Sequence, residues 1–246
     1  MTKPANVIQC AELIKKAKNI VALTGAGIST SCGIPDFRGP EGLYVTKRYD
    51  ADTIFDIDYF HRDPKPFFDF ARDFISLEEK ILPSFTHQFF AKLEQSGKCK
   101  AIITQNIDSL HQKAGSQNVL EFHGSFLRSH CLSCGKKYDY STMRKLISTF
   151  SVPRCVDGGV IKPDVVFFGE NVLFQADAAK LAEESDLFFV IGTSCVVHPA
   201  GSIPLYAGGD IIIVNLTPVK LPITNIALEV NSDIDQFFQE VAKLIK

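Results

Sequence analysis

The chain has 246 residues, of which 26 are Lys or Arg and 28 are Asp or Glu, so its formal net charge is −2. This balance argues against nucleic acid or an anionic membrane as the main partner, and a hydrophobic share of 46% excludes a disordered chain. The seven cysteines are an odd number, and the first twenty residues lack the long apolar stretch of a secretory signal. We therefore expect thiol or metal chemistry in a reducing, cytoplasmic setting rather than a disulfide scaffold. No apolar run approaches the ~18 residues that a membrane span needs.

Short apolar runs alternate with helix-like segments along the chain. Helical spacing of apolar residues predicts helices over 11–19, 83–97 and 175–185. Continuous apolar runs, typical of parallel strands buried on both faces, predict strands over 20–24, 100–104, 164–168, 187–191 and 211–214. This alternation predicts a doubly wound α/β fold. Two stretches interrupt it: 37–80, rich in Phe, Tyr and Asp without a clear strand, and about 125–162, which holds three cysteines and has the character of an inserted module.

A glycine-containing loop, Gly25-Ala26-Gly27, directly follows the first predicted strand. Two glycines one residue apart let the backbone turn tightly and bring its N–H groups to a phosphate. The dinucleotide fingerprint is incomplete, because Thr30 stands where a third glycine is expected and no second strand with an acidic end follows. The loop is therefore either a dinucleotide site or a tight strand-to-helix turn, and Arg38 either serves a phosphate or ribose or lies on the surface.

A polar cluster, Gln105, Asn106 and Asp108, follows the strand predicted at 100–104. Open α/β sheets bind ligands at the carboxyl ends of their strands, although Asn and Asp also stabilise ordinary turns. Amide and carboxylate groups beside a glycine loop favour the ligand-binding interpretation.

Six sequence blocks together resemble those of the sirtuins, the NAD-dependent protein lysine deacylases. They are GAGIS at 25–29 with GIPDFRG at 33–39, TQNID at 104–108 with LH at 110–111 and AG at 114–115, EFHGS at 121–125, KPDVVFFGE at 162–170, GTS at 192–194 and VN at 214–215. The match runs in order over about residues 10–240. We expect a Rossmann-like doubly wound parallel sheet formed by 1–36, 81–124 and 163–246, a cofactor loop and helical segment over 37–80, and a small inserted zinc-binding module over 125–162.

By this resemblance NAD is a co-substrate. Gln105 would hold the nicotinamide ribose, Asn106 would order that ribose and nearby water, and Asp108 with the Ile107 backbone would receive the nicotinamide carboxamide. Phe37 would cover the departing nicotinamide. The expected cofactor contacts are Gly25, Ala26, Gly27, Thr30, Asp36, Phe37, Arg38, Gln105, Asn106, Ile107, Asp108, Gly192, Thr193, Ser194, Asn215 and Asp233.

The resemblance also implies the reaction, with His123 and Asn106 as the catalytic residues. The acyl oxygen of a modified lysine would attack C1′ of the ribose as nicotinamide departs, and His123 would then activate the 2′-hydroxyl, because a neutral imidazole can accept a proton near pH 7. The products would be nicotinamide, which is also an inhibitor, free lysine and 2′-O-acyl-ADP-ribose. His111 is expected to help shape the site, and the remaining histidines are expected to be structural: His61, His87, His130 and His198.

Two extended segments would hold an acyl-lysine peptide through its backbone, a mode that tolerates many sequences. The expected substrate contacts are Val166, Phe167, Phe168, Gly169 and Val196, and Cys195 beside the last stands where the family usually has an aliphatic residue. Phe68 and Ala71, next to Arg72, align with the Tyr and Arg of sirtuins that favour acidic acyl groups. A carboxylate in this apolar pocket would lack a partner, so we predict neutral acyl groups, acetyl first.

Three cysteines in the inserted segment have the spacing of a structural zinc site. Cys131 and Cys134 form a CxxC turn, and Cys155 follows with Asp157 at the position where sirtuins have a fourth cysteine before Gly-Gly. Because a carboxylate can bind zinc, the four residues are either a structural Cys₃Asp site or a site that has lost its metal. The other cysteines are expected to be buried small residues: Cys10, Cys32, Cys99 and Cys195.

Two other functions stay open. The same cleavage of NAD could send ADP-ribose to a protein side chain, which would make the protein a mono-ADP-ribosyltransferase. The chain could also be a non-catalytic NAD-binding scaffold, although the intact Asn106, Asp108 and His123 argue against that. Neither a dinucleotide nor an acylated peptide requires a basic face, so we expect no nucleic-acid or membrane partner.

Overall fold

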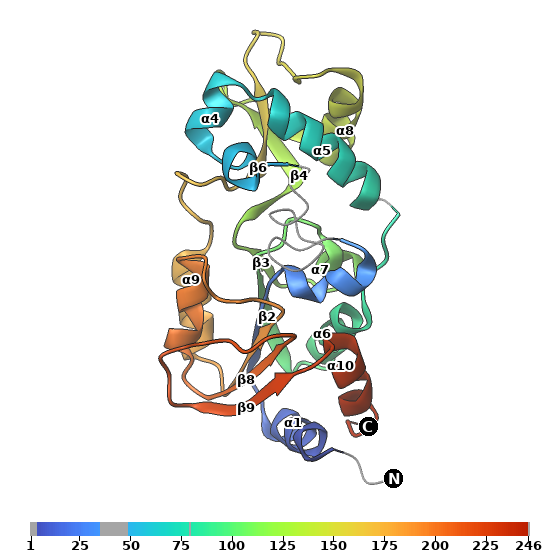
Figure 1. The fold of residues 1–246 in the computed structure, drawn as a ribbon, viewed down its shortest axis with the longest axis vertical. Coiled ribbons are helices and arrows are strands. Elements are labelled where there is room, and N and C mark those ends of the chain that lie inside the picture. The colour runs from blue at the N-terminus through green and yellow to red at the C-terminus, as the bar shows by residue number, and fades with distance from the viewer. Residues whose placement is uncertain (1–3, 35–48, 79, 246) are drawn as a thin grey trace.

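The computed structural model describes residues 4–34, 49–78 and 80–245. A six-stranded sheet forms its larger half, shown in the lower part of Figure 1. All of its pairings are parallel, and the strand order is β3-β2-β1-β7-β8-β9. The strands are β1 (Ile20–Thr24), β2 (Cys99–Thr104), β3 (Val119–Glu121), β7 (Leu187–Ile191), β8 (Asp210–Asn215) and β9 (Ile226–Asn231). The chain builds outward from β1 on both sides, which confirms the predicted doubly wound fold.

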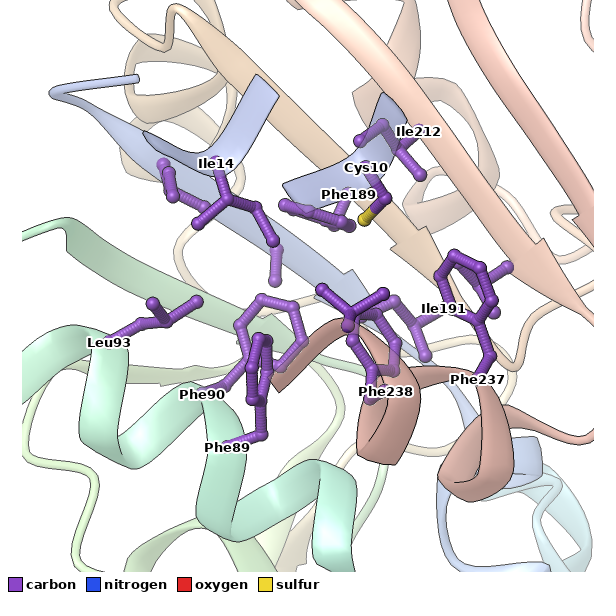
Figure 2. Close-up of a cluster of buried hydrophobic side chains, with 14 of the residues drawn as sticks. Cys10, Ile14, Phe89, Phe90, Leu93, Phe189, Ile191, Ile212, Phe237 and Phe238 are labelled. Carbon is purple, nitrogen blue, oxygen red and sulfur yellow. The ribbon is translucent and has the colours of Figure 1, made fainter. Parts of the chain in front are cut away.

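Alternate residues of these strands face two separate layers of helices. On one face, Ala22 and Phe189 pack in a cluster with residues of α1 (Ala5–Lys16), α6 (Phe85–Gln95) and α10 (Ile234–Ala242). Figure 2 shows the aromatic centre of that cluster, where Phe90 of α6 and Phe238 of α10 lie under Phe189 at ring separations of 5.3 and 6.0 Å. On the other face, Phe188 packs against α9 (Gln175–Glu183) and η3 (Ala200–Tyr206). Burial on both faces explains why these strands are apolar throughout.

A second, smaller unit lies above the sheet in Figure 1 and has its own aromatic core. It contains a three-stranded sheet in the order β5-β4-β6 with antiparallel pairings. Its elements are α3 (Ala51–Ile54), α4 (Ile57–Arg62), α5 (Lys65–Glu78), β4 (Gly124–Cys131), β5 (Lys137–Asp139), α8 (Tyr140–Thr149) and β6 (Ile161–Val165). One cluster of buried rings joins α3–α5 to the sheet, with Phe67 of α5 at 6.1 Å from Phe126 of β4 and 4.8 Å from Phe167.

The strand predicted at 164–168 is wrong in both position and partner. The strand found there, β6, ends at Val165 and pairs antiparallel with β4 in the small sheet instead of joining the large parallel one. Its apolar residues are buried in the aromatic cluster, so its sequence resembles that of a buried strand of the large sheet. A short apolar run shows burial, but it does not show which sheet a strand joins.

Short segments connect the carboxyl ends of the central strands. The turns η1 (Ala26–Ile28) and η2 (Thr30–Cys32) follow β1, and α7 (Leu110–Lys113) follows β2. Because β1 is where the chain starts to build in both directions, these segments meet at the topological switch point, which is the ligand-binding position of open α/β sheets. Within the described ranges, no helix has the length and apolar character needed to cross a membrane.

Candidate active site

A cleft of about 1470 Å³ runs along the carboxyl edge of the large sheet and extends under the smaller unit. Segments that follow β1, β2, β7 and β8 line one part of it, together with the start of α10. Residues of α5 and the segment after β6 line another part. The cleft therefore connects the region where a dinucleotide would bind with the region where a peptide would bind.

The glycine loop packs directly against the segment after β7. Gly25 N–H donates to the Ile191 carbonyl at 3.0 Å, and Gly27 N–H donates to the Gly192 carbonyl at 2.9 Å. A Cβ on Gly27 would lie 2.8 Å from the Gly192 Cα, and one on Gly192, which has φ +60°, would lie 2.5 Å from the Ile28 nitrogen. Only glycines permit this approach. Of the three N–H groups of the loop, that of Ala26 forms no hydrogen bond within the described residues, so it is the one available to a phosphate.

The Gln105–Asp108 segment is tied to the glycine loop through Ser29. Ser29 Oγ donates to Asp108 Oδ2 at 2.7 Å, and Asn106 Nδ2 lies 3.2 Å from both Ser29 Oγ and the Gly25 carbonyl. Gln105 Nε2 donates to Thr193 Oγ1 at 3.0 Å, so the segment also contacts the loop after β7. These bonds hold three polar side chains in fixed positions on the cleft wall.

His123 lies on the cleft wall with one ring nitrogen already occupied. Its Nδ1 is 3.0 Å from the Gln105 carbonyl, and because a carbonyl only accepts, Nδ1 carries the hydrogen. Burial lowers the pKa of His123 below its usual value of 6.5, while the bond to Gln105 opposes that shift. The imidazole is therefore neutral near pH 7 and keeps its Nε2 lone pair available as a base.

Two further histidines, His87 and His111, lie buried behind this segment, with ring centroids 4.6 Å apart. His87 Nδ1 accepts from the Ser84 N–H, and His111 Nε2 lies 3.0 Å from Thr24 Oγ1. The other nitrogen of each ring is buried with no hydrogen-bond partner in the described part of the chain. Burial lowers the pKa of His87 to about 4 and that of His111 well below 6.5, so both rings are neutral at pH 7.

The segment after β6 forms the far wall of the cleft. Phe168 pairs with the start of α4, since its N–H donates to the Phe55 carbonyl at 2.7 Å and its carbonyl accepts from Ile57 N–H at 3.1 Å. Val166 N–H donates to the His123 carbonyl at 2.8 Å, which couples this wall to the candidate base. The Val166 carbonyl and the Gly169 N–H take part in no hydrogen bond among the described residues. A peptide bound in an extended conformation could form hydrogen bonds with these two backbone groups.

The helix face predicted to form the acyl pocket is corrected by the structure. Phe68 and Ala71 are fully buried in the aromatic core and do not line the cleft. Arg72 donates to the Ile147 and Phe150 carbonyls of the α8 region and to Asp69. The residues of α5 that line the cleft are Phe70, Asp73, Phe74, Ser76 and Leu77. A helix turns about 100° per residue, so an error of two or three positions selects a different face.

Most of the residues expected to bind cofactor or substrate line this single cleft. They are Gly25, Ala26, Gly27, Thr30, Gln105, Asn106, Ile107, Asp108, His123, Val166, Phe167, Phe168, Gly169, Gly192, Thr193, Ser194, Asn215 and Asp233. Val196 does not line it, although its neighbour Val197 does. The expected contacts Asp36, Phe37 and Arg38 lie outside the described residues.

Sequence reasoning missed two cleft residues that organise the site. Ser29 bonds to both Asp108 and Asn106, and its place inside the GAGIS block was the signal that could have found it. Asp235 accepts from Ser31 Oγ and from the backbone and side chain of Thr86. No local pattern marks Asp235, because its partners are far away in the sequence.

The four predicted metal ligands lie together in the small unit, away from the cleft. Their ligand atoms are all within 4.8 Å of one another. Cys134 Sγ lies 3.7 Å from Cys155 Sγ, and Cys131 Sγ lies 3.5 Å from Asp157 Oδ1. Tetrahedral zinc with Zn–S of 2.3 Å and Zn–O of 2.0 Å requires separations of about 3.8 Å between sulfurs and about 3.5 Å between sulfur and oxygen. The spacing therefore fits a zinc ion.

Gly159 completes this cradle. A Cβ at that position would lie 2.6 Å from Cys131 Sγ and 2.5 Å from Ser133 Oγ, so a side chain there would displace a ligand. Tyr138 OH donates to Cys155 Sγ at 3.0 Å, which favours the thiolate form that binds metals. Of the remaining cysteines, Cys10, Cys99 and Cys195 are buried as expected, and Cys32 is partly buried.

Comparison with known proteins agrees with this site. A sequence model of the Sir2 family matches residues 25–199. The NAD-dependent protein deacetylase of Thermotoga maritima is 43% identical over 94% of each chain, and that of Sulfurisphaera tokodaii is 44% identical over 96% of this chain and 94% of its own. The chain therefore belongs to the Sir2 family.

Solved Sir2 structures also share the fold. A Sir2 variant with a deacetylated p53 peptide and 3′-O-acetyl ADP ribose superposes with a TM-score of 0.88 at 40% identity, covering 97% of this chain and 98% of that one. Sir2 with a p53 peptide and NAD⁺ gives a TM-score of 0.86 at 39% identity, covering 96% of each chain.

Proposed function

We propose that this protein is an NAD-dependent protein deacetylase, which moves the acyl group of an acyl-lysine side chain onto the ADP-ribose part of NAD. The observation that carries this proposal is the meeting of three features in one cleft: the glycine loop, the Gln105–Asp108 segment and the neutral imidazole of His123. The relatives that match nearly the whole chain bear the same name.

The residues of the large sheet would bind and orient the dinucleotide. Gly25–Gly27 line the cleft where a diphosphate would lie, and Asn215 at the end of β8 and Asp233 just before α10 line it where an adenosine would fit. Gln105 and Asn106 would contact the nicotinamide ribose, and Asp108, held by Ser29, would receive the carboxamide. When bound, NAD supplies the glycosidic bond that breaks and the ribose hydroxyls that accept the acyl group.

His123 would act as the general base. The Gln105 carbonyl fixes the hydrogen on Nδ1, so Nε2 can accept a proton from a ribose hydroxyl. The lowered pKa keeps that nitrogen unprotonated near pH 7. Removing a base of this kind costs typically 10²–10⁴-fold in rate, so we expect a loss of that order in His123→Ala.

The acyl-lysine peptide would bind between Val166–Gly169 and the segment around Val196. The Val166 carbonyl and the Gly169 N–H, which form no hydrogen bond among the described residues, offer backbone hydrogen bonds to the peptide. Val196 is 56% exposed, and its neighbour Val197 lines the cleft. The wall formed by α5 presents Phe70, Phe74 and the Asp73 carboxylate. An acidic acyl chain would meet the Phe70 and Phe74 rings there, so neutral acyl groups are expected.

Zinc would be held by Cys131, Cys134, Cys155 and Asp157 as a structural ion. All four ligand positions would be filled by protein side chains, and His123 lies outside the cluster. Such a closed site contributes to folding and does not activate water. The zinc would then stabilise the loops next to the antiparallel sheet that carries the peptide-binding segment.

Three broader expectations from the sequence belong to the same proposal. Nicotinamide would be both product and inhibitor, and the protein would work in the cytoplasm. The domain limits of 1–36 with 81–124 and 163–246, of 37–80, and of 125–162 remain predictions.

One assay tests the function and its alternatives. The protein is incubated with NAD and an acetyl-lysine peptide while nicotinamide, acyl-ADP-ribose and labelled protein are followed. Nicotinamide release that needs the acetylated peptide, and that is lost in His123→Ala but kept in the exposed-site variant His61→Ala, supports deacetylation. Labelled protein without peptide would indicate ADP-ribosyl transfer, and no NAD turnover would indicate a binding protein.

A further inference from the structure

A buried lysine lies directly beneath the peptide-binding wall. Lys162, in β6, is only 2% exposed. Its Nζ donates to the Val165 carbonyl at 2.7 Å and to Glu170 Oε2 at 2.8 Å, and lies 4.1 Å from the centroid of the Phe167 ring. Burial lowers the pKa of Lys162, and the Glu170 carboxylate opposes that shift. The ammonium group therefore contacts three residues of one short segment that lines the cleft.

Glu170 lies at the other end of this segment and forms hydrogen bonds within it. Its Oε2 accepts from the Phe167 N–H at 2.8 Å as well as from Lys162, while its own N–H donates to the Phe167 carbonyl at 3.0 Å. These bonds enclose a tight turn that contains Gly169 at φ +93°. The turn positions the Gly169 N–H, and the Lys162 contact at Val165 determines where the chain leaves β6 before Val166.

An ion pair with a buried member is a costly way to stabilise a core, and here Lys162 is 2% exposed while Glu170 is 30% exposed. Apolar residues of similar volume are often neutral or stabilising by comparison, so a retained pair is more informative about conformation than about stability. Here Lys162 donates to the Val165 carbonyl and Glu170 accepts from the Phe167 N–H, so the pair bonds to backbone atoms on both sides of Val166 and spans the turn that contains Gly169. Within the described residues, the Lys162 ammonium and the Glu170 carboxylate form hydrogen bonds with no side chain other than each other.

We propose that Lys162 and Glu170 are positioning residues that fix the peptide-binding backbone of the cleft, and that they control peptide affinity without affecting NAD affinity. This inference rests on the proposed function. Because the pair acts on backbone groups, its effect is the same for peptides of unrelated sequence around the acyl-lysine. None of the hydrogen bonds that the pair forms in the described structure involves the glycine loop, the Gln105–Asp108 segment or the His123 ring, so we expect the dinucleotide contacts to be unchanged.

The test compares single and double variants. Glu170→Gln leaves a buried ammonium without its counter-ion, and Lys162→Met leaves a carboxylate without its cation, so either single variant can lose stability for that reason alone. The double variant Lys162→Met with Glu170→Gln removes both charges and keeps the apolar stem, and Lys162→Arg keeps the charge. The control is Lys65→Met, which breaks the exposed pair with Asp69 on α5 of the same unit.

Steady-state constants are measured for two acetyl-lysine peptides of unrelated sequence and for NAD. In the double variant, we expect the KM for both peptides to rise at least about tenfold, which corresponds to about 1.4 kcal/mol, while the KM for NAD stays within about twofold. Lys162→Arg is expected to keep most of the wild-type peptide affinity, and Lys65→Met is expected to change neither the peptide KM nor the NAD KM. An unchanged peptide KM in a folded double variant, or an equal rise in both KM values, would overturn the proposal.

Direct binding of a labelled acetyl-lysine peptide separates this inference from the proposed function. Wild-type turnover with an unaffected double variant refutes the positioning role and leaves the function intact. Peptide binding without turnover in the wild type, lost in the double variant, refutes the function and supports the positioning role. A wild type that neither binds nor turns over the peptide refutes both.

Discussion

His87 and His111 should make the stability of this protein fall sharply between pH 7 and pH 5. Both rings are buried and neutral, with burial lowering the pKa of His87 to about 4 and that of His111 well below 6.5. The carboxylates of Asp108 and Asp235 face His87 and partly oppose its shift, while His87 itself lowers the pKa of His111. The unfolded chain has neither the burial nor these neighbours, so its histidines titrate near 6.5.

The sign follows from proton binding. Below pH 6.5 the unfolded state takes up a proton on each histidine and the folded state does not, so the free energy of unfolding falls as pH falls. Between pH 7 and pH 5 an ordinary histidine gains about 2 kcal/mol of protonation free energy. Two such residues remove about 4 kcal/mol, which is a large part of a typical total of 5–15 kcal/mol.

Urea unfolding at pH 7 and pH 5 measures this effect. With a slope of about 3 kcal/mol/M, the wild-type midpoint should fall by about 1 M or more. His87→Asn can be less stable at both pH values, but its midpoints should differ by clearly less than those of the wild type, because His111 and His123 still contribute and the contribution of His87 is gone. His61→Asn, which alters an exposed histidine of α4, should keep the full wild-type difference. A wild-type midpoint that is the same at both pH values would refute the reasoning, as would a His87→Asn difference equal to that of the wild type.

Three further predictions follow from the zinc cradle, the cleft wall and the glycine loop. Purified protein should contain about one zinc per chain by mass spectrometry. Asp157→Ala should lower the zinc content, whereas Val156→Ala, at a neighbouring residue that is 94% exposed, should leave it unchanged. A wild-type protein without zinc would contradict the predicted metal site. The kcat/KM for an acetyl-lysine peptide should exceed that for a succinyl-lysine peptide at least about 100-fold, because the apolar rings of Phe70 and Phe74 line the wall and leave a carboxylate without a partner. Comparable values for the two peptides would contradict this prediction. Gly192→Ala should lower the free energy of unfolding by about 2–3 kcal/mol and Tm by about 5–10 °C, because its Cβ would lie 2.5 Å from the Ile28 nitrogen. Gly135→Ala, at φ +70° with no atom nearby, is the control for backbone strain alone. An equal loss of Tm in both variants would show that the close contact is unimportant.

Local patterns in the sequence were enough to predict the doubly wound sheet and most of the cleft. Four of the five predicted strands belong to the parallel sheet, because burial on both faces leaves a continuous apolar run that is visible within five or six residues. The glycine loop and the Gln105–Asp108 segment directly follow two of those strands, so strand order alone brings them to one edge. The spacing of Cys131, Cys134 and Cys155 likewise identifies the metal cluster.

Only the tertiary structure decided which partner each buried group has. β6 has the same apolar character as the other strands, yet it joins the antiparallel sheet, because sheet membership depends on contacts with β4, thirty or more residues away. The cleft-facing side of α5 depends on how the helix packs against Phe126 and Phe167, and this packing places Phe70 rather than Phe68 on the wall. The His87–His111 pair and the contacts of Glu170 with Lys162 also arise from packing.

The division has one physical cause. Period, turn chemistry and ligand spacing are encoded over a few residues, so this sequence by itself determined the strands, the loops and the chemistry-bearing side chains. Burial, pKa values and the direction in which a helix face points depend on neighbours brought together by folding. Contacts formed on folding therefore determine the properties of Lys162, His87 and Phe70 in this protein.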